Sequence, residues 1–145
     1  MIAVDTNILV YAHREDNEFH DAAKKLIESL RAGGHTWGIA WPCVHELISV
    51  VTHPGIFKRP STLPEVFGFI DALIASPPLQ LFAESSGYLE KLRQLSAAAR
   101  IKGPRIHDAR IAALCLHHGV SELWSADRDF SAFPQLKIRN PLVKA

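Results

Sequence analysis

The chain opens with Met1-Ile2-Ala3-Val4-Asp5-Thr6-Asn7-Ile8-Leu9-Val10-Tyr11-Ala12, in which a short apolar run ends at three polar residues. The run Ile2–Val4 is too short for a helix and suits a strand that is buried on both faces. Asp5 follows it directly, and in an open α/β sheet ligands bind just beyond the carboxyl ends of the strands. Asp is also favoured at the cap position that starts a helix. This stretch alone leaves both roles of Asp5 open.

The whole chain has the composition of an ordinary folded domain. Its 145 residues are 48% hydrophobic and 21% charged, which does not match a disordered tail. This length predicts a single domain, residues 1–145, around one hydrophobic core. The formal net charge of +1 says little about partners, because local patches of charge matter more than the total.

The cysteines and the hydrophobic runs bear on the cellular compartment. Cys43 and Cys115 lie in apolar surroundings, which suits buried free thiols in a reducing compartment. The N-terminus has no basic leader, and no apolar run approaches the ~18 residues that span a bilayer. We therefore expect a cytoplasmic protein that does not enter a membrane.

Short apolar runs alternate with helical patterns along the chain. The expected strands are Ile2–Val4, Trp37–Ala40, Leu79–Phe82, Leu123–Ser125 and Leu136–Ile138. The expected helices are Ile8–Ala12, one from Phe19 or His20 to about Ala32, one from Pro42 that ends near His53-Pro54-Gly55, Pro64–Ala75, Ser86–Arg100 and a last one that starts at Asp108 and ends before Gly119. This alternation predicts an α/β fold, a three-layer sandwich with a short, mainly parallel central sheet.

Four acidic residues stand out by their positions relative to these elements. Asp5 follows the first strand and Asp127 follows the fourth, while Glu46 and Asp108 lie in the first turns of helices. Parallel strands place their carboxyl ends at one edge of the sheet, where the following helices also begin. We therefore expect the four side chains to converge, with Asp129 beside Asp127. Each residue taken alone also fits an ordinary capping or turn position.

A cluster of four carboxylates requires compensation for its charge. Two unit charges ~4 Å apart repel by ~4 kcal/mol at an effective dielectric of 20, whereas a domain has only ~5–15 kcal/mol of net stability. A divalent cation would remove this repulsion, and a set of carboxylate oxygens suits magnesium or manganese better than zinc. One or two such ions activate water and stabilise the leaving oxygen of a phosphodiester.

The same residues carry a resemblance to a known family. The chain resembles the PIN-domain ribonucleases, and it looks closest to the VapC-like toxins of type II toxin–antitoxin systems. The resemblance runs nearly end to end and rests on four segments: Val4-Asp5-Thr6-Asn7-Ile8-Leu9, the helix-borne Glu46, Asp108-Ala109, and Ser125-Ala126-Asp127-Arg128-Asp129-Phe130. Asp-Thr-Asn alone is a weak signal, and its combination with the later acids is fairly specific.

This resemblance implies an activity, partners and site residues. It implies an endoribonuclease that depends on Mg²⁺ or Mn²⁺ and hydrolyses RNA phosphodiester bonds, a VapB-like antitoxin partner and a homodimer. The family's acidic quartet corresponds to Asp5, Glu46, Asp108 and Asp127, with Asp129 as an additional or alternative metal ligand. The supporting polar residues correspond to Thr6, Asn7 and Ser125, where Ser125 replaces the Thr of many members and keeps the hydroxyl.

Other functional classes fit the sequence less well. His45-Glu46-Leu47-Ile48-Ser49 begins like the zinc-protease motif, but Ser49 replaces its second histidine. A phospho-receiver domain has paired acids after its first strand and a late lysine, and neither is convincing here. A catalytically inactive PIN-like module that binds RNA or protein is the alternative, although no expected carboxylate is missing.

Basic residues lie near the expected site in the sequence. Lys102, Arg105 and Arg110 flank Asp108, and Arg128 lies between two acids. These side chains are candidates for neutralising RNA phosphates beside the carboxylates. An ordinary solvated helix face explains the first three equally well, and Arg128 could pair with a neighbouring carboxylate instead.

Overall fold

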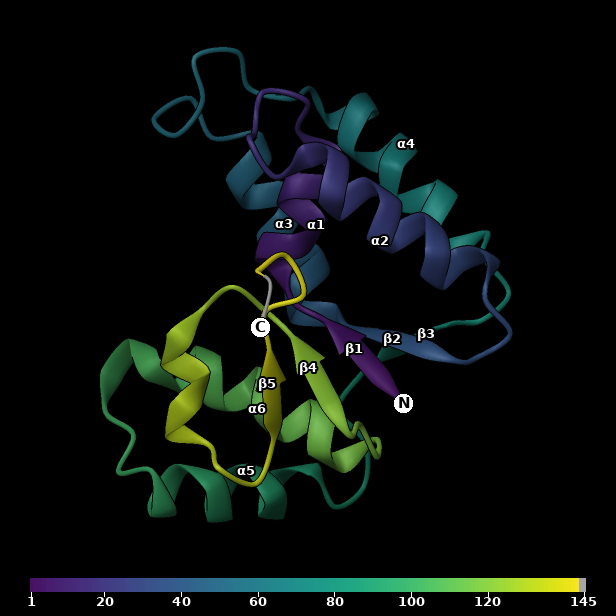
Figure 1. Cartoon of the computed structure of the whole chain (residues 1–145). Coiled ribbons are helices and arrows are strands. Elements are labelled where there is room, and N and C mark those ends of the chain that lie inside the picture. The colour runs from purple at the N-terminus through teal and green to yellow at the C-terminus, as the bar shows by residue number, and fades with distance from the viewer. Residues whose placement is uncertain (144–145) are drawn as a thin grey trace.

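The computed structural model describes residues 1–143 and contains a five-stranded sheet with helices packed around it (Figure 1). The strands are β1 (Ile2–Val4), β2 (Trp37–Ala40), β3 (Leu79–Phe82), β4 (Glu122–Trp124) and β5 (Lys137–Arg139). The α-helices are α1 (Thr6–His13), α2 (His20–Ala32), α3 (Trp41–Val51), α4 (Leu63–Ile74), α5 (Tyr88–Ala98) and α6 (Ile106–His117). Two 3₁₀ helices, η1 (Gly103–Arg105) and η2 (Arg128–Ala132), precede α6 and follow β4.

The first strand lies at the centre of the sheet. The strand order is β3-β2-β1-β4-β5, and every neighbouring pair is parallel. Ala3 and Val4 are buried, as expected for a central strand covered on both faces. The carboxyl ends of β1, β2 and β4 therefore meet at one edge, so the residues that follow these strands are brought together.

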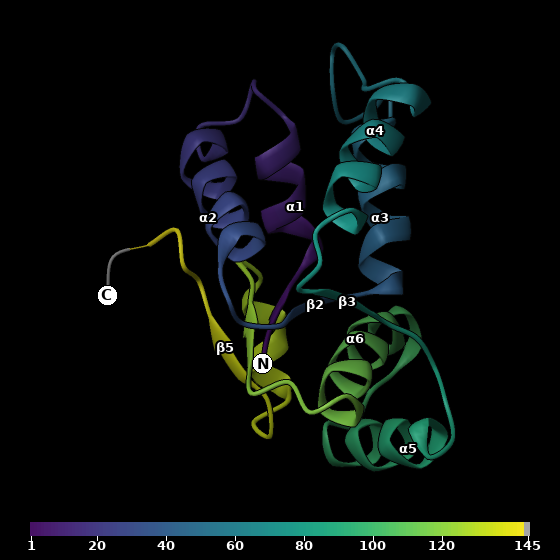
Figure 2. The same ribbon diagram turned by 90° about the vertical axis from the view of Figure 1, so that its right-hand side faces the viewer.

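The helices cover both faces of the sheet. In Figures 1 and 2, α1 to α4 lie on one side of the strands and α5 and α6 lie on the other. The core fills the space between these layers, and its largest fully buried side chains include Trp37, Phe82, Phe130, Phe133, Ile8 and Leu9. The expected α/β sandwich is confirmed, with a sheet that is wholly parallel.

Helix α1 begins two residues earlier than the sequence pattern indicated. Asp5 is its N-cap, and the Asp5 side chain accepts a hydrogen bond from the Thr6 backbone N–H at 2.8 Å. The capping interaction allows the helix to start at Thr6, inside what looked like a polar connection. Asp5 is thus both a helix cap and the residue at the carboxyl end of the central strand.

Other helix and strand boundaries differ from the expected ones by one to two residues. Backbone geometry explains why α5 is shorter than expected at both ends. Helix α5 starts at Tyr88 because Gly87, its N-cap, has a left-handed φ of 91°. It ends at Ala98, since Arg100 adopts φ 53° and terminates the helix. Helix α6 starts at Ile106, directly after η1, so Asp108 lies in its first turn and is not its first residue. The expected last two strands shift by one residue to β4 and β5.

Reciprocal hydrogen bonds between Thr62 and Glu65 define the start of α4. Thr62 accepts a hydrogen bond from the Glu65 backbone N–H, and the Glu65 side chain accepts one from the Thr62 N–H. This capping box fixes the start of α4. None of the helices within residues 1–143 is both long enough and apolar enough to cross a membrane.

Candidate active site

The structure brings the four candidate acids to one edge of the sheet. Asp5 directly follows β1 and Asp127 lies just beyond β4, which pairs with β1. Glu46 lies on α3, the helix that starts where β2 ends, and Asp108 lies in the first turn of α6. Four segments that are distant in the sequence therefore supply carboxylates to one site.

Asp5 is the most buried member of this site, with 4% of its surface exposed. Its Oδ1 accepts the Thr6 N–H at 2.8 Å, and its Oδ2 accepts the Ser125 hydroxyl at 2.7 Å. The Cys43 thiol lies 3.5 Å from Oδ1 and donates a weak hydrogen bond. These donors hold the carboxylate in a single orientation.

Asn7 and Ser125 fix the turn that carries Asp127. The Ser125 Oγ donates to Asp5 and accepts hydrogen bonds from Asn7 Nδ2 at 3.2 Å and from the Asp127 N–H at 3.0 Å. Asn7 Oδ1 in turn accepts the Ala126 N–H at 3.1 Å. The hydroxyl of Ser125 thus uses its one donor and both acceptor positions. The turn after β4 is bound to the start of α1 by side chains about 120 residues away in sequence.

The environment of Asp5 disfavours its charge despite these hydrogen bonds. Burial raises the pKa of Asp5, the hydrogen bonds from Ser125 and Thr6 lower it in part, and the nearby charge of Asp127 raises it further. A carboxyl group that is buried beside another carboxylate is one that a cation would stabilise in its ionised form.

Glu46 and Asp108 respond to the same cluster of negative charge. Glu46 is accessible to solvent, but partial desolvation of its carboxyl group raises its pKa, and the charges of Asp5, Asp108 and Asp127 raise it further. Desolvation also raises the pKa of Asp108, followed by the charges of Asp127 and Asp129. The four carboxylates therefore lie close enough in the folded protein to repel one another.

Thr6 presents a hydroxyl group to this site. Its side chain is buried, and within residues 1–143 Thr6 Oγ1 has no partner at hydrogen-bond geometry. The hydroxyl lies near Glu46, where it partly offsets the rise in the pKa of that carboxyl group. A buried polar atom without a partner is costly, which favours a bound water or ligand atom at this position.

The carboxylates suit a hard divalent cation, although they are not arranged as a finished coordination shell. Within residues 1–143 no three His, Cys, Asp or Glu side chains lie in a group that already matches a metal site. Magnesium usually keeps several of its waters, so its site does not need a complete shell of protein ligands. The all-oxygen donor set, the mutual repulsion and the unpartnered Thr6 hydroxyl therefore fit Mg²⁺ or Mn²⁺.

Cys43 is a contact of the site that the sequence analysis missed. It was expected to be a buried free thiol, and both cysteines are buried and free. Its contact with Asp5 was not expected. The available signal was its position three residues before Glu46 on α3, since residues three apart share a helix face.

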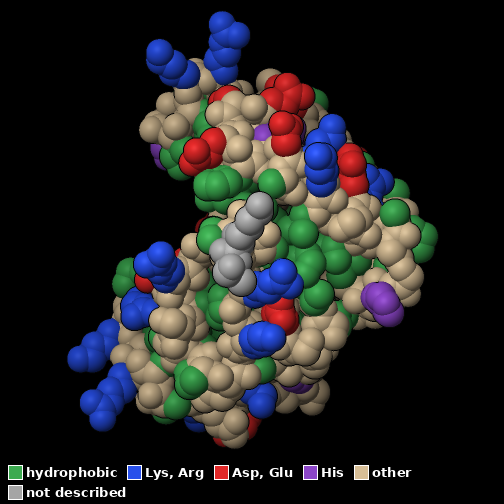
Figure 3. Space-filling model, in the orientation of Figure 1, with side chains coloured by type: hydrophobic (Ala, Val, Ile, Leu, Met, Phe, Trp, Pro, Cys, Tyr) green, Lys and Arg blue, Asp and Glu red, His purple; other side chains and the backbone are tan. Residues whose placement is uncertain are grey.

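The candidate RNA-binding residues differ in their surroundings. Lys102 and Arg105 are exposed, and Arg105 donates a hydrogen bond to the backbone carbonyl of Asp129 at 3.2 Å. Arg110 forms an ion pair with Glu84 at 2.8 Å, so its charge is largely balanced. Arg128 is exposed beside Asp127. Figure 3 shows Lys and Arg side chains on the left of the molecule, below the hollow between its two halves.

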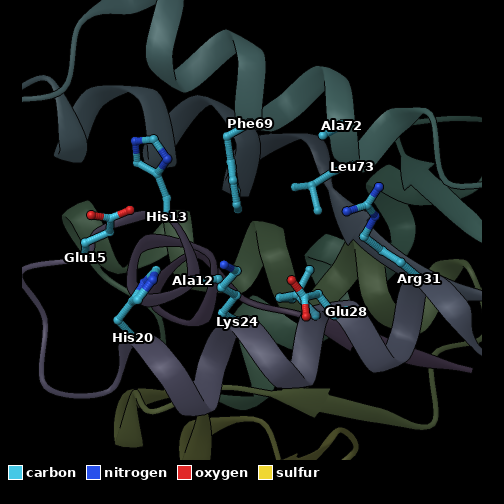
Figure 4. A pocket seen from close by; sticks show the side chains of 11 residues that line it. Ala12, His13, Glu15, His20, Lys24, Glu28, Arg31, Phe69, Ala72 and Leu73 are labelled. Carbon is cyan, nitrogen blue, oxygen red and sulfur yellow. The ribbon is translucent and has the colours of Figure 1, made fainter.

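A separate pocket lies between α2 and α4, away from the carboxylates (Figure 4). It has a volume of about 220 Å³, and Phe69 and Leu73 of α4 form its apolar wall. Lys24, Glu28 and the other polar side chains of its rim come mainly from α2 and the preceding loop. None of the four acids of the candidate active site lines this pocket.

A parallel α/β sandwich with acids clustered beyond its central strands is the arrangement that the resemblance to the PIN domains implied. The PIN domain family model matches residues 2–136, and this chain belongs to that family. Among its relatives, Ribonuclease VapC43 of Mycobacterium tuberculosis is 34% identical over 142 residues, covering 98% of this chain and 96% of the relative. Ribonuclease VapC48 of the same species is 32% identical over 137 residues, or 94% of each chain.

The fold also matches solved structures. A chain in the crystal structure of VapBC2 from Rickettsia felis, bound to a DNA fragment from their promoter, superposes with a TM-score of 0.69. That match covers 96% of this chain and 98% of the other at 21% sequence identity. The expected PIN-like fold and the resemblance to VapC ribonucleases are thus confirmed.

Proposed function

We propose that this protein is a metal-dependent endoribonuclease and the toxin of a toxin–antitoxin pair, with residues 1–145 forming one PIN domain. The observation that carries this proposal is the convergence of four mutually repelling carboxylates on a PIN fold. Its relatives' names, which describe VapC ribonucleases, support RNA as the substrate.

Asp5, Glu46, Asp108 and Asp127 would hold Mg²⁺ or Mn²⁺, with Asp129 as an additional ligand. When bound, such an ion supplies positive charge that activates water and stabilises the leaving oxygen of the phosphodiester. The remaining steps belong to the side chains of this protein, which position the ligands and handle protons.

Each supporting residue has a distinct task in this proposal. Ser125 and the Thr6 N–H hold Asp5 in place, and Asn7 fixes the turn that carries Asp127. The Thr6 hydroxyl is available to donate to a water or phosphate oxygen. Glu46 is the most accessible member of the quartet, so it is the best placed to exchange a proton with the attacking water.

Lys102, Arg105 and Arg128 are proposed to contact the RNA backbone, with a smaller contribution from Arg110. The first three are exposed, and Arg105 and Arg128 lie next to members of the acidic cluster. Their charge offsets that of the carboxylates, which would otherwise repel the phosphates. Arg110 contributes less because Glu84 already balances it.

Substitution of Lys102 and Arg105 by Gln is expected to weaken RNA binding and reduce its dependence on salt. Each lost phosphate contact lowers the slope of log affinity against log salt by about 0.7 for a single strand, so the pair lowers it by about 1.4. Binding of a single-stranded RNA at 50 to 300 mM salt measures this slope. The matched control replaces Lys25 and Arg31, two exposed cations on α2, with Gln. An equal slope in both double variants would reject the assignment.

The proposed partners are a VapB-like antitoxin and a second copy of the chain. The proposed location is the cytoplasm, where RNA substrates occur. The pocket between α2 and α4 is suited to a side chain of an antitoxin helix, because an apolar wall lies beneath a charged rim. On another face of α4, Leu63, Phe67 and Ile74 are exposed and form a second apolar surface. Exposed apolar surface of this kind commonly marks a protein interface.

The proposed activity is tested by incubating the purified protein with total RNA in Mg²⁺, in Mn²⁺ and in chelator, and then mapping the new RNA ends. We expect discrete internal cuts with either ion and none in chelator. Equal cleavage with and without chelator would reject the metal dependence. Intact RNA with both ions would instead favour an inactive RNA- or protein-binding module.

A further inference from the structure

A cavity of about 470 Å³ lies directly beside the acidic cluster, and no step described above uses it. Three segments form it: the turn after β4, the helix η2, and the residues at and beyond the end of β5. Its lining residues are Ser125, Ala126, Asp127, Arg128, Ser131, Ile138, Asn140 and Val143. Asp127 belongs both to this wall and to the acidic cluster, so any occupant would be adjacent to the carboxylates.

The wall formed by the turn after β4 is fixed before any ligand binds. The hydrogen bonds of Ser125 and Asn7 hold the backbone at Ala126 and Asp127. Asp127 Oδ1 also accepts the Asp129 N–H at 2.8 Å, which starts η2. A cavity with a rigid wall can discriminate between ligands, since less binding energy is lost in ordering it.

The polar groups of the cavity are suited to a neutral, planar ligand. Asn140 Oδ1 accepts the Leu142 N–H at 3.0 Å, and this orients the amide. Within residues 1–143 the Asn140 NH₂ group makes no hydrogen bond, so it can donate to a ligand. Ser131 adds an exposed hydroxyl that can donate or accept. Asn140 and Ser131 line the cavity together with one basic residue, Arg128, and one acidic residue, Asp127.

The apolar groups of the cavity favour the same kind of ligand. Ile138 is partly buried in its wall, and Val143 is 61% exposed at its rim. A phosphate beside Asp127 requires a cation to offset the two negative charges, whereas a neutral flat heterocycle can contact Ile138 and the plane of the Arg128 guanidinium without one. Single-stranded RNA is recognised through such face contacts together with hydrogen bonds to base edges. The volume of the cavity is also within the ~300–1,000 Å³ of small-molecule sites.

We propose that this cavity binds one nucleobase of the RNA, next to the cleaved phosphodiester, and that Asn140 and Ser131 read the edge of that base. The proposal rests on the ribonuclease function proposed above and adds a determinant of its sequence preference. One face of the base contacts Ile138 and the other lies against the plane of the Arg128 guanidinium, whose in-plane N–H groups remain free to donate to the RNA backbone. Asn140 donates to an acceptor on the edge of the base. Preference at this one nucleotide position therefore depends on Asn140.

The test compares cleavage patterns of the full chain on a pool of RNAs randomised around one cut site. Asn140→Ala removes the donor, while Asn140→Asp keeps the acceptor for the Leu142 N–H and replaces the donor with an acceptor. We expect both variants to change the relative rates of preferred and disfavoured bases by about tenfold or more at a single position. The matched control is Asn17→Ala, because Asn17 accepts the Phe19 N–H at 2.8 Å in the same type of turn, outside the cavity.

A second measurement separates this inference from the proposed nuclease function. In chelator, without cleavage, each of the four nucleoside 5′-monophosphates is titrated into the ¹⁵N-labelled protein. We expect one of them to shift the Asn140 side-chain amide resonance and to leave that of Asn17 unchanged. Suppose that the wild type cleaves RNA. If both Asn140 variants then keep its base preference, or lose activity equally at every base, this inference is overturned and the nuclease function is not. Wild type that leaves RNA intact with both ions would overturn the nuclease function and this inference together.

Discussion

Asp5→Asn is expected to abolish RNA cleavage while the protein stays folded. The substitution keeps the size of the side chain and the acceptor for the Thr6 N–H, but it removes a charge from the centre of the site. The lost charge is expected to raise the activation free energy of cleavage by several kcal/mol. Each ~1.4 kcal/mol lowers the rate tenfold, so the rate should fall about a thousandfold or more. The measurement is the initial rate of cleavage of one RNA in saturating Mn²⁺.

The control for this substitution is Asp21→Asn, which removes an exposed carboxylate from the first turn of α2. It should cut RNA at the wild-type rate. Circular dichroism and a thermal melt establish that Asp5→Asn is folded. Removal of a buried repelling charge offsets the loss of the hydrogen bond that Ser125 donates to Oδ2, the position taken by the new amide NH₂ group. Wild-type activity in a folded Asp5→Asn protein would show that Asp5 is no part of the active site.

The second large effect concerns stability, because the carboxylates repel one another when no cation is bound. The pKa values of Asp5, Glu46 and Asp108 are raised in the folded state, so folding favours their protonated forms. In chelator, the stabilisation that comes from protonating these three groups is fully present below their ordinary pKa values. This stabilisation is lost as the pH rises above about 4 and through the raised pKa values of the folded state. The lowered pKa of His13 destabilises the fold as the pH falls, equally in the wild type and in Asp108→Asn. We therefore expect the change from pH 7.5 to pH 5 in chelator to favour the melting temperature of the wild type more than that of Asp108→Asn.

A bound cation should reverse this loss. At a hundredfold excess over its dissociation constant, a ligand specific for the folded state adds ~2.7 kcal/mol of stability, or roughly 5 to 10 °C in melting temperature for a domain of this size. Asp108→Asn should lose most of the response to Mn²⁺. In chelator at pH 7.5 it should nevertheless equal or exceed the stability of the wild type, because one repelling charge is gone.

The competing explanation treats Asp108 only as a first-turn residue of α6. A carboxylate there stabilises the helix by ~0.3–1 kcal/mol through the helix dipole. In that case Asp108→Asn would lower the melting temperature slightly, and by the same amount with and without Mn²⁺. Thermal melts of both proteins under the two conditions distinguish these explanations. A loss of stability that is independent of metal would contradict a clustered cation site.

Much of the fold is readable from the sequence because its elements carry strong local signals. The apolar run Ile2–Val4, the paired glycines after α2 and the capping box at Thr62 each specify structure within a few residues. The alternation of strands and helices then requires a parallel sheet, and that sheet predicts which acids meet. The convergence of Asp5 with Asp127 follows from topology, without knowledge of any side-chain conformation.

The parts that the sequence did not yield depend on contacts between distant side chains. The hydrogen bonds by which Ser125 orients Asp5 and Asn7 holds Ala126 were not derivable from spacing, although the family resemblance pointed to Asn7 and Ser125. The contact of Cys43 with Asp5 carried no local signal beyond a shared helix face with Glu46. The boundary of α5 depended on the left-handed backbone at Arg100, which is unusual for a residue with a side chain.

The rate of cleavage of one defined single-stranded RNA as a function of free Mn²⁺ tests the central claim most directly. The claim is that carboxylates from four segments form one site at which a divalent cation supports RNA hydrolysis. We predict no cleavage in chelator, a rate that rises with Mn²⁺ and saturates, and recovery of the full rate when Mn²⁺ is returned to chelator-treated protein. A rate in chelator equal to that in saturating Mn²⁺ would contradict the account.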